Sequence, residues 1–221
     1  MKNFSWSYSS LDLYTQCPHK YFRLKVKRDI KEPISAQLLY GNRFHKAAEN
    51  FIQNNTPLPP EFNFAEKSLD ILRNRKGQHL CEYRMGLTRE LTPCRFSDLN
   101  VWWRGIADLL TLQEDRAFII DYKTGHHPKY ANTKQLEILS LAVFKHFPKI
   151  KRIKAGLVFV NANDFIPTIY ESDEQNNYWT KWIADVDKLE QAFQVDVWNP
   201  RPNFTCKSWC PVLDCTHNGK G

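Results

Sequence analysis

The residues best suited to chemistry are two aspartates and a lysine set among apolar residues. Asp108 opens one apolar run, and Asp121 lies near the end of the next, two residues before Lys123. A polar turn at residues 113–116 separates the two runs, so the pattern predicts a β-hairpin. Aspartate and lysine are poor strand formers. Their presence on a buried hairpin therefore indicates a chemical role rather than a packing role.

Two carboxylates that converge across a hairpin can bind a hard cation such as Mg²⁺ or Mn²⁺. Lys123 points to the same face as Asp121, because side chains alternate along a strand. The side chain of Tyr122 points the other way, although its backbone carbonyl can reach the metal. A metal that polarises a phosphate, beside an ammonium group that orients water, is suited to phosphodiester hydrolysis.

The elements that must position these residues can be read from apolar periodicity and turn signals. Ser9 and Ser10 are predicted to cap a first short helix, and Pro167 favours an edge position for the last strand. Residues 124–131 are predicted to form a mobile loop over the site. Further helices are predicted at residues 38–53, 64–72, 134–146 and 173–195, and further strands at residues 78–91, 153–160 and 165–170.

The bulk composition is that of a folded, basic protein. Of its 221 residues, 42% are hydrophobic, and the net charge of +7 fits a polyanionic partner such as nucleic acid. The sequence contains no signal-peptide pattern and no long apolar run, so we expect a cytoplasmic protein with no membrane partner. Reducing surroundings disfavour disulfides, and a cluster among the six cysteines therefore indicates a metal.

A basic and aromatic segment near the N-terminus is a candidate for contacts with DNA. Its positive charges suit phosphates, and its aromatic rings suit stacked bases. The alternative is that the aromatic residues belong to the core and that the charges form a solvated helix face. The candidate DNA-binding residues are Lys20, Tyr21, Arg23 and Lys25.

The hairpin motif, Gly105-x-x-Asp108 followed by Asp121-x-Lys123, resembles the PD-(D/E)XK nuclease superfamily. The resemblance implies an α/β (α+β) fold with a restriction-endonuclease-like core, in which helices flank a mixed central sheet. It also implies a single nuclease domain over residues 1–221. Within it we expect a basic and aromatic arm at 1–37, the nuclease core at 38–198 and a cysteine-rich tail at 199–221.

Two further features resemble the RecB-type branch of this superfamily: Gly41-x-x-x-His45 upstream of the hairpin and Gln135 downstream. The branch often has a tyrosine four residues after the glutamine, whereas this chain has Leu139. The resemblance assigns Gln135 to DNA contact or to steadying the site. It implies that His45, Asp108, Asp121 and the carbonyl of Tyr122 bind the metal and that Lys123 is the catalytic lysine.

Glu82 has two readings. It begins a strand-like segment, where an exposed position without function is the simpler interpretation. A place beside the metal site is the other, so Glu82 is a possible site neighbour.

The cysteines add to the resemblance. AddB-like and CRISPR-associated RecB-like exonucleases place one cysteine before the nuclease core and three after it, to bind a [4Fe-4S] cluster. Cys17, Cys206, Cys210 and Cys215 are similarly placed, although the middle cysteine of the tail departs from the usual spacing. A cluster would clamp the N-terminal segment to the C-terminal tail. Zinc is the alternative, because four thiolates suit it equally well.

These features together predict a divalent-metal-dependent deoxyribonuclease, and specifically an exonuclease that acts on DNA ends or single strands. The alternative is a non-catalytic or partner-dependent nucleic-acid binding subunit on the same fold. A helicase or a recombination or integration protein would then be the partner.

Overall fold

The computed structural model describes residues 4–125 and 132–219, which form two compact units. The first, here called the sheet unit, comprises Ser35–Trp179. The second, here called the terminal unit, comprises Met1–Ile34 and Thr180–Gly221. The predicted arm and tail thus contribute to the same unit, while the extent of the nuclease domain stays a prediction. Most of the predicted loop at residues 124–131 lies outside the described residues.

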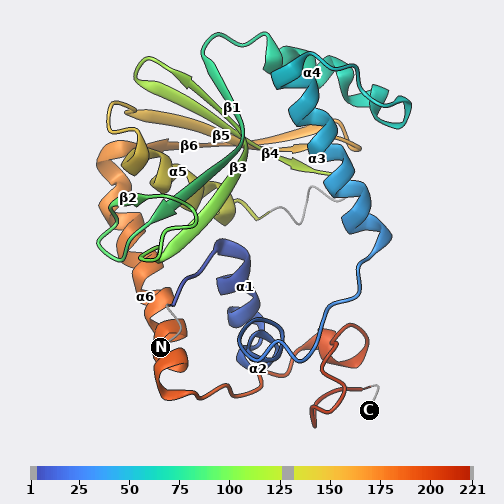
Figure 1. Ribbon diagram of the computed structural model, residues 1–221, viewed down its shortest axis with the longest axis vertical. Helices are drawn as coiled ribbons and strands as arrows, with labels where there is room; N and C mark the ends of the chain where they lie inside the picture. The colour runs from blue at the N-terminus through green and yellow to red at the C-terminus, as the bar shows by residue number, and fades with distance from the viewer. Residues whose placement is uncertain (1–3, 126–131, 220–221) are drawn as a thin grey trace. The chain divides into compact units, whose positions relative to one another are not determined.

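A six-stranded sheet is the centre of the sheet unit (Figure 1), and its strand order is β2-β1-β3-β4-β5-β6. All neighbours pair antiparallel except β4 and β5, which run parallel and are joined through helix α5 (Lys134–His146). The strands are β1 (Gln78–Leu87), β2 (Pro93–Cys94), β3 (Trp103–Gln113), β4 (Arg116–Lys123), β5 (Arg152–Phe159) and β6 (Asp164–Glu171). The prediction of a mixed sheet flanked by helices is confirmed. Pro167 lies on an edge strand, as predicted.

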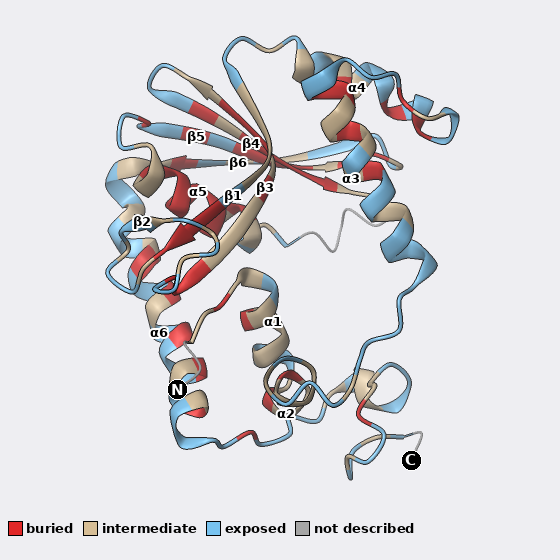
Figure 2. Cartoon of the chain, in the orientation of Figure 1, coloured by how far each residue is buried: buried red, intermediate tan, exposed pale blue. Residues whose placement is uncertain are grey.

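Helices cover the sheet because its strands carry apolar side chains toward them. Helices α3 (Ala36–Asn54) and α4 (Glu66–Arg73) share a buried cluster with Leu109, Ile120 and Tyr122. Side chains alternate along β4, so its completely buried Ile119 faces the opposite side. Helix α5 is not part of that cluster, and it contacts β4 and β5. Figure 2 shows buried residues concentrated in the central strands and in α5.

Polar caps fix the starts of the two helices that contribute site residues. The Ser35 side chain accepts a hydrogen bond from the backbone amide of Leu38 at 3.1 Å, and α3 begins at the next residue, Ala36. The amide of Lys134 at the start of α5 donates to the side chain of Asn132 at 3.0 Å. These caps satisfy amides that have no partner within the helix.

Strands β3 and β4 pair over only part of their length. Their register runs from Gln113 opposite Arg116 to Leu109 opposite Ile120. Beyond that point β3 continues beside β1, while β4 continues beside β5 as far as Lys123. The two strands therefore separate just where Asp108 and Asp121 occur. We call this opening the strand fork.

The terminal unit contains α1 (Tyr8–Gln16), α2 (Pro18–Tyr21), the π-helical turn η1 (Phe22–Val26) and a short 3-10 turn, η5 (Phe204–Lys207). Helix α6 (Gln175–Val195) crosses the boundary between the units along the chain. Aromatic contacts dominate the core of this unit. Trp6 stacks on Trp182 at 6.0 Å, and Phe22 stacks on Trp198 at 5.5 Å.

The predicted cap of the first helix was wrong by a few residues. Ser7, rather than Ser9 or Ser10, is the N-cap, because its backbone is extended and its side chain accepts from the amide of Ser10 at 3.3 Å. Ser10 returns the contact, since its hydroxyl oxygen accepts from the Ser7 amide at 2.8 Å. Within residues 4–125 and 132–219, no helix has both the length and the apolar character needed to span a membrane.

Candidate active site

Three side chains from three different elements meet beside the strand fork. His45 comes from α3, Glu82 from β1 and Asp108 from β3, and one ligand atom from each lies within 4.8 Å of the other two. The Nδ1 atom of His45 lies 3.4 Å from Asp108 Oδ1 and 3.8 Å from Glu82 Oε1. One nitrogen and two carboxylates at these separations form a group that can hold a metal ion.

Glu82 reaches this group through an unusual backbone conformation. Its φ is +48°, in the left-handed region, which non-glycine residues rarely adopt within a strand. The pairing of β1 with β3 is interrupted there, since it passes from Cys81 opposite Leu109 to Tyr83 opposite Ala107. Local backbone strain of this kind is retained where the surrounding structure holds it, often at functional sites. The strand position of Glu82 was readable from the sequence, but its backbone conformation was not.

Asp121 and Lys123 form a second pair on the neighbouring strand. Asp121 is 3% exposed, and its Oδ2 lies 2.6 Å from Lys123 Nζ. This contact is an ion pair without hydrogen-bond geometry, so the buried oxygen retains capacity to accept. Lys123 Nζ also donates to Gln135 Oε1 at 3.3 Å, which connects the pair to α5. The structure thus brings the predicted lysine and glutamine together.

Burial governs the charge of Asp121. Burial first, and then repulsion from Asp108, raise the pKa of Asp121 from 3.8 to about 6, although Lys123 opposes the shift. A carboxylate held in this way is relieved by any nearby positive charge. Lys123 supplies one such charge at 2.6 Å, and a divalent cation would add to it.

Asp108 links the group to the fork. Its Oδ1 faces His45, while its Oδ2 accepts a hydrogen bond from the backbone amide of Tyr122 at 2.8 Å. The ring of Tyr122 points into the core and contacts Phe44 edge-to-face at 5.7 Å. The amide of Tyr122 is therefore at the fork while its side chain is not, and the metal-binding role of its carbonyl stays a prediction.

The charge of His45 responds to the same carboxylates. Burial by itself would lower the pKa of His45, but Asp108 and Glu82 raise it, and the result is about 10. The imidazole is therefore protonated when no metal is present. Its proton supplies positive charge between two carboxylates, which is the charge that a metal ion would supply. The donor set of carboxylates and one imidazole fits Mg²⁺ or Mn²⁺.

Contacts behind the site hold the segment after β4. The amide of Val160 donates to the Lys123 carbonyl at 3.0 Å, and the side chain of Asn161 donates to the Thr124 carbonyl at 2.7 Å. A Cβ atom added at Gly41 on α3 would lie 3.5 Å from Thr124 Oγ1, so the helix passes close to this segment. The contribution of Asn161 had no signal in the sequence.

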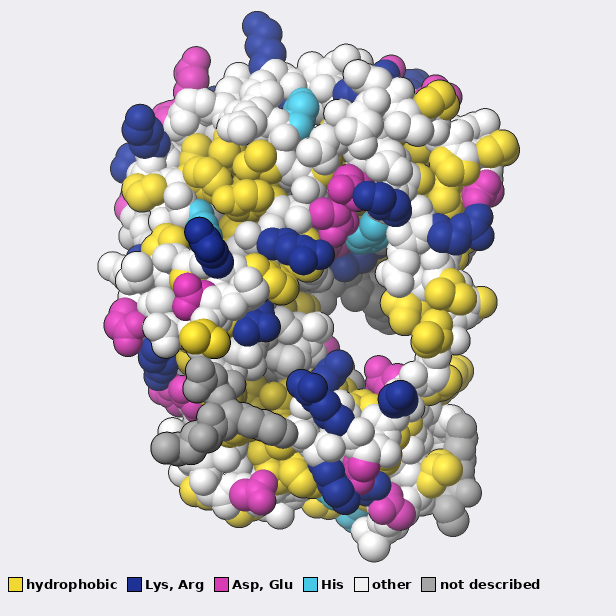
Figure 3. Space-filling view, in the orientation of Figure 1, with side chains coloured by type: hydrophobic (Ala, Val, Ile, Leu, Met, Phe, Trp, Pro, Cys, Tyr) yellow, Lys and Arg dark blue, Asp and Glu magenta, His cyan; other side chains and the backbone are white. Residues whose placement is uncertain are grey.

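Acidic side chains adjoin a histidine on the face shown in Figure 3, with Lys and Arg side chains on both sides of them. Such an arrangement can attract a polyanion while carboxylates bind the cation that activates it. The described residues therefore provide both a candidate metal centre and basic surroundings for a phosphate backbone.

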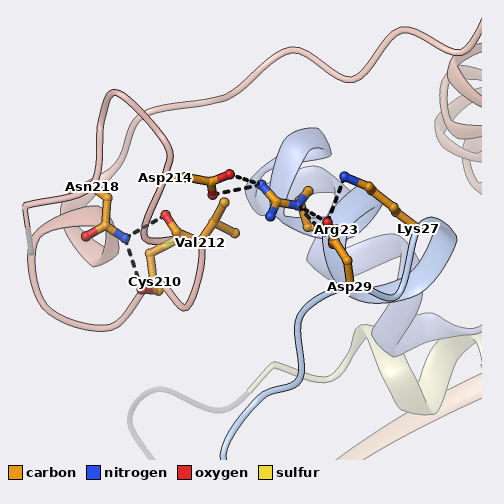
Figure 4. Close-up of polar contacts among 7 residues, drawn as sticks. All are labelled: Arg23, Lys27, Asp29, Cys210, Val212, Asp214 and Asn218. Carbon is orange, nitrogen blue, oxygen red and sulfur yellow. Dashed lines mark hydrogen bonds and ion pairs between the residues drawn. The ribbon is translucent and has the colours of Figure 1, made fainter. Parts of the chain in front are cut away.

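The four predicted DNA-binding residues lie in the terminal unit, and three have partners there. The ring of Tyr21 is buried and lies 5.7 Å from Trp198, and Lys20 pairs with Glu32 at 3.2 Å. Arg23 binds two carboxylates, those of Asp29 and Asp214 (Figure 4). Lys25 is exposed. Their role in DNA binding stays a prediction.

The four predicted cysteine ligands also lie in the terminal unit, where they line one small cavity. Among residues 4–125 and 132–219, no three cysteine sulfur atoms lie within 4.8 Å of one another. Backbone amides point at two of the sulfurs, since Arg201 donates to Cys17 Sγ and Asn203 donates to Cys206 Sγ, both at 3.4 Å. The Asn218 side chain donates to the carbonyls of Cys210 and Val212 (Figure 4).

The fold and the site define a class. A family model for the PD-(D/E)XK nuclease superfamily matches residues 5–215, and the chain belongs to this superfamily. Nucleases of this superfamily use divalent metals, in agreement with the group at His45, Glu82 and Asp108. The observed sheet is the expected restriction-endonuclease-like core.

Two solved structures of other proteins are similar to this chain, and the first shares its fold. A candidate exonuclease from Eubacterium rectale is 12% identical, with a TM-score of 0.58, and the match covers 95% of this chain and 87% of that one. The protein SSO0001 is 11% identical, with a TM-score of 0.49, over 99% of this chain and 89% of that one. No curated protein matches the chain in a sequence comparison.

Proposed function

We propose that the protein is a divalent-metal-dependent deoxyribonuclease of the RecB type that degrades DNA from ends or along single strands. The observation that carries the proposal is the meeting of His45, Glu82 and Asp108 beside the buried pair of Asp121 and Lys123. A protein that only bound DNA would need no buried carboxylate with a raised pKa next to a lysine.

The site residues have different proposed roles in phosphodiester hydrolysis. Bound Mg²⁺ or Mn²⁺ supplies Lewis acidity toward the scissile phosphate and acidifies water. His45, Asp108 and Asp121 would hold the cation, with the Tyr122 carbonyl and the Glu82 carboxylate as further ligands. Lys123 orients the attacking water and stabilises charge that develops on the phosphate. Gln135 restrains the Lys123 ammonium group through the 3.3 Å contact.

The nuclease assignment is tested on metal-loaded protein with labelled DNA. Asp121→Ala and Lys123→Ala should each abolish hydrolysis with the fold intact. Asp115→Ala, in the exposed turn between β3 and β4, is the matched control and should leave activity unchanged. Undiminished activity in the first two variants would overturn the site. Wild-type protein that bound DNA with steep salt dependence yet cut nothing would instead indicate a non-catalytic or partner-dependent subunit.

Substrates of different topology distinguish exonuclease from endonuclease cleavage. A linear duplex and a closed circle of the same sequence should behave differently, because an exonuclease needs an end. We expect degradation of the linear duplex and of single strands, with the closed circle intact. Equal loss of the closed circle would make the enzyme an endonuclease and would leave the metal site assignment untouched.

We also propose that Cys17, Cys206, Cys210 and Cys215 bind a [4Fe-4S] cluster that joins the two ends of the chain. The four thiols line one cavity of the terminal unit, which supports a metal group shared among them. The amides that donate to Cys17 and Cys206 match the hydrogen bonding of cluster sulfurs.

The cluster has a direct test. Protein purified without oxygen should be brown, with iron and sulfide in equal amounts, and Cys210→Ser should lose both. Cys94→Ser is the control, because Cys94 lies on β2 in the sheet unit and outside the proposed set. A colourless protein that contains zinc would contradict the proposal.

A further inference from the structure

A pocket of about 270 Å³ lies between α4 and strands β4, β5 and β6, within the sheet unit. Phe118, Ile120 and Val158 are among its apolar lining residues. Side chains alternate along β4, so Phe118 and Ile120 face away from the side of Asp121 and Lys123. The pocket is therefore separate from the candidate metal centre.

Large apolar side chains are exposed at the pocket. Ile71 of α4 is 62% exposed, and Phe165 of β6 is 42% exposed. The ring of Phe165 lies against Gly156, since a Cβ atom added there would be 2.1 Å from it. On the same strand, Ile169 is 49% exposed and extends the apolar surface along the edge of the sheet. Contiguous exposed apolar side chains of this kind mark interaction sites.

Positive charge accompanies the apolar lining. The Arg75 guanidinium lies 4.0 Å from the centre of the Phe118 ring, and Lys154 Nζ lies 5.9 Å from that of Phe165. Arg75 Nε is buried and has no hydrogen-bond acceptor within the described residues. Among the described lining residues Asp164 is the one carboxylate, and its Oδ1 accepts from the Phe165 amide at 2.8 Å. The pocket thus complements a ligand that is apolar and carries negative charge.

The aromatic rings exclude a stacked nucleobase as the best occupant. Arg75 occupies a face of Phe118, while Phe165 has Gly156 against its ring and Lys154 over it. Each ring thus already has a cation against it, which disfavours the base stacking that single-strand binding uses. The volume is also below the range of about 300–1,000 Å³ typical of small-molecule sites. It suits one or two amino-acid side chains.

We propose that this pocket docks a segment of a partner protein, which inserts an apolar anchor side chain and places adjacent Asp or Glu residues against Arg75 and Lys154. The mode is that of a short peptide whose buried anchor carries the affinity and whose rim charges carry the specificity. The described lining residues of the pocket include none of the metal-centre residues, so a docked partner need not displace them.

The test uses random short peptides displayed on phage, selected on the full-length protein and then synthesised. We expect selected peptides to combine an apolar residue with neighbouring carboxylates. Binding should shift the methyl NMR signals of Ile71, Leu72, Ile120 and Val158. The double variant Arg75→Glu/Lys154→Glu should weaken binding at least about tenfold. Lys67→Glu, on the exposed part of α4 outside the pocket, is a charge-reversal control and should change binding less than about twofold.

Each contrary outcome overturns the proposal. No selected peptide, or peptides whose binding survives the double charge reversal, would mean that the pocket is not a peptide site. An oligothymidylate that shifted the same methyl signals and displaced the peptides would make it a nucleic-acid surface instead. The thermal unfolding midpoint and metal-dependent DNA hydrolysis show that the variants are folded, since neither changed residue belongs to the metal centre.

Discussion

Replacement of Asp121 by asparagine should stabilise the metal-free protein. Asp121 is 3% exposed, and its pKa is raised from 3.8 to about 6. A carboxyl group with a raised pKa in the folded state binds its proton more tightly there than in the unfolded chain. Its ionisation therefore opposes folding. The penalty is absent below pH 3.8 and is complete above about pH 6, where a shift of about two units costs about 3 kcal/mol.

Asparagine keeps the size of the side chain and removes the charge. Lys123 loses its ion-pair partner in this variant, but its side chain is 37% exposed and keeps Gln135 as an acceptor. We therefore expect a net gain of about 1–3 kcal/mol at neutral pH. In a chain of this size each kcal/mol raises the melting temperature by about 2–4 °C. Metal should stabilise the variant less than the wild type, because the variant lacks one of the proposed ligands.

Thermal unfolding in a chelator at neutral pH, and again near pH 4, measures this effect. The gain of Asp121→Asn should be present at neutral pH and largely absent near pH 4. Asp115→Asn in the exposed turn between β3 and β4 is the matched control and should change the melting temperature little. The reasoning would be refuted if Asp121→Asn melted at or below the wild type in chelator, or if metal stabilised the two proteins equally.

Three further predictions concern the same site. Glu82→Gln should weaken Mn²⁺ binding about tenfold in calorimetry, because a charged ligand is lost; unchanged affinity would remove Glu82 from the ligand set. Metal binding at neutral pH should release a proton from His45, whose pKa is about 10, so metal affinity should rise with pH up to that value. Calorimetry in buffers of different ionisation enthalpy measures how many protons are released. If no proton is released on metal binding, His45 is not protonated in the metal-free protein. Gln135→Ala should lower kcat about tenfold and leave metal affinity unchanged, because Gln135 contacts Lys123 rather than a proposed metal ligand. A parallel loss of metal affinity would contradict a positioning role for Gln135.

Local patterns predicted much of the sheet unit. The alternation from Ala117 to Tyr122, the helix from Lys134 to His146 and the apolar run at residues 153–160 correspond to β4, α5 and β5. These elements carry their signals within a few residues of sequence, so periodicity is sufficient to find them. The hairpin turn at residues 113–116 is local in the same sense.

The features of the site that the sequence could not predict depend on contacts between residues far apart in the chain. The strand fork depends on β4 continuing beside β5 after its pairing with β3 has ended, and no local pattern around Asp108 signals it. The left-handed backbone of Glu82 had no local signal either. Arg23 was read as a DNA contact, yet its guanidinium binds Asp214, which is 191 positions away in the chain. A charged residue in a basic segment does not disclose a partner so distant in sequence.

The hydrogen bond from the Tyr122 amide to Asp108 Oδ2 joins β3 and β4 where they separate, and its acceptor is a side chain that can change its charge. In a regular ladder the acceptor would be a backbone carbonyl, whose charge is fixed. Here the acceptor is a carboxylate whose partial charge changes whenever a proton or a cation engages its other oxygen. The strength of this contact between β3 and β4 is therefore thermodynamically linked to whether the metal centre is occupied.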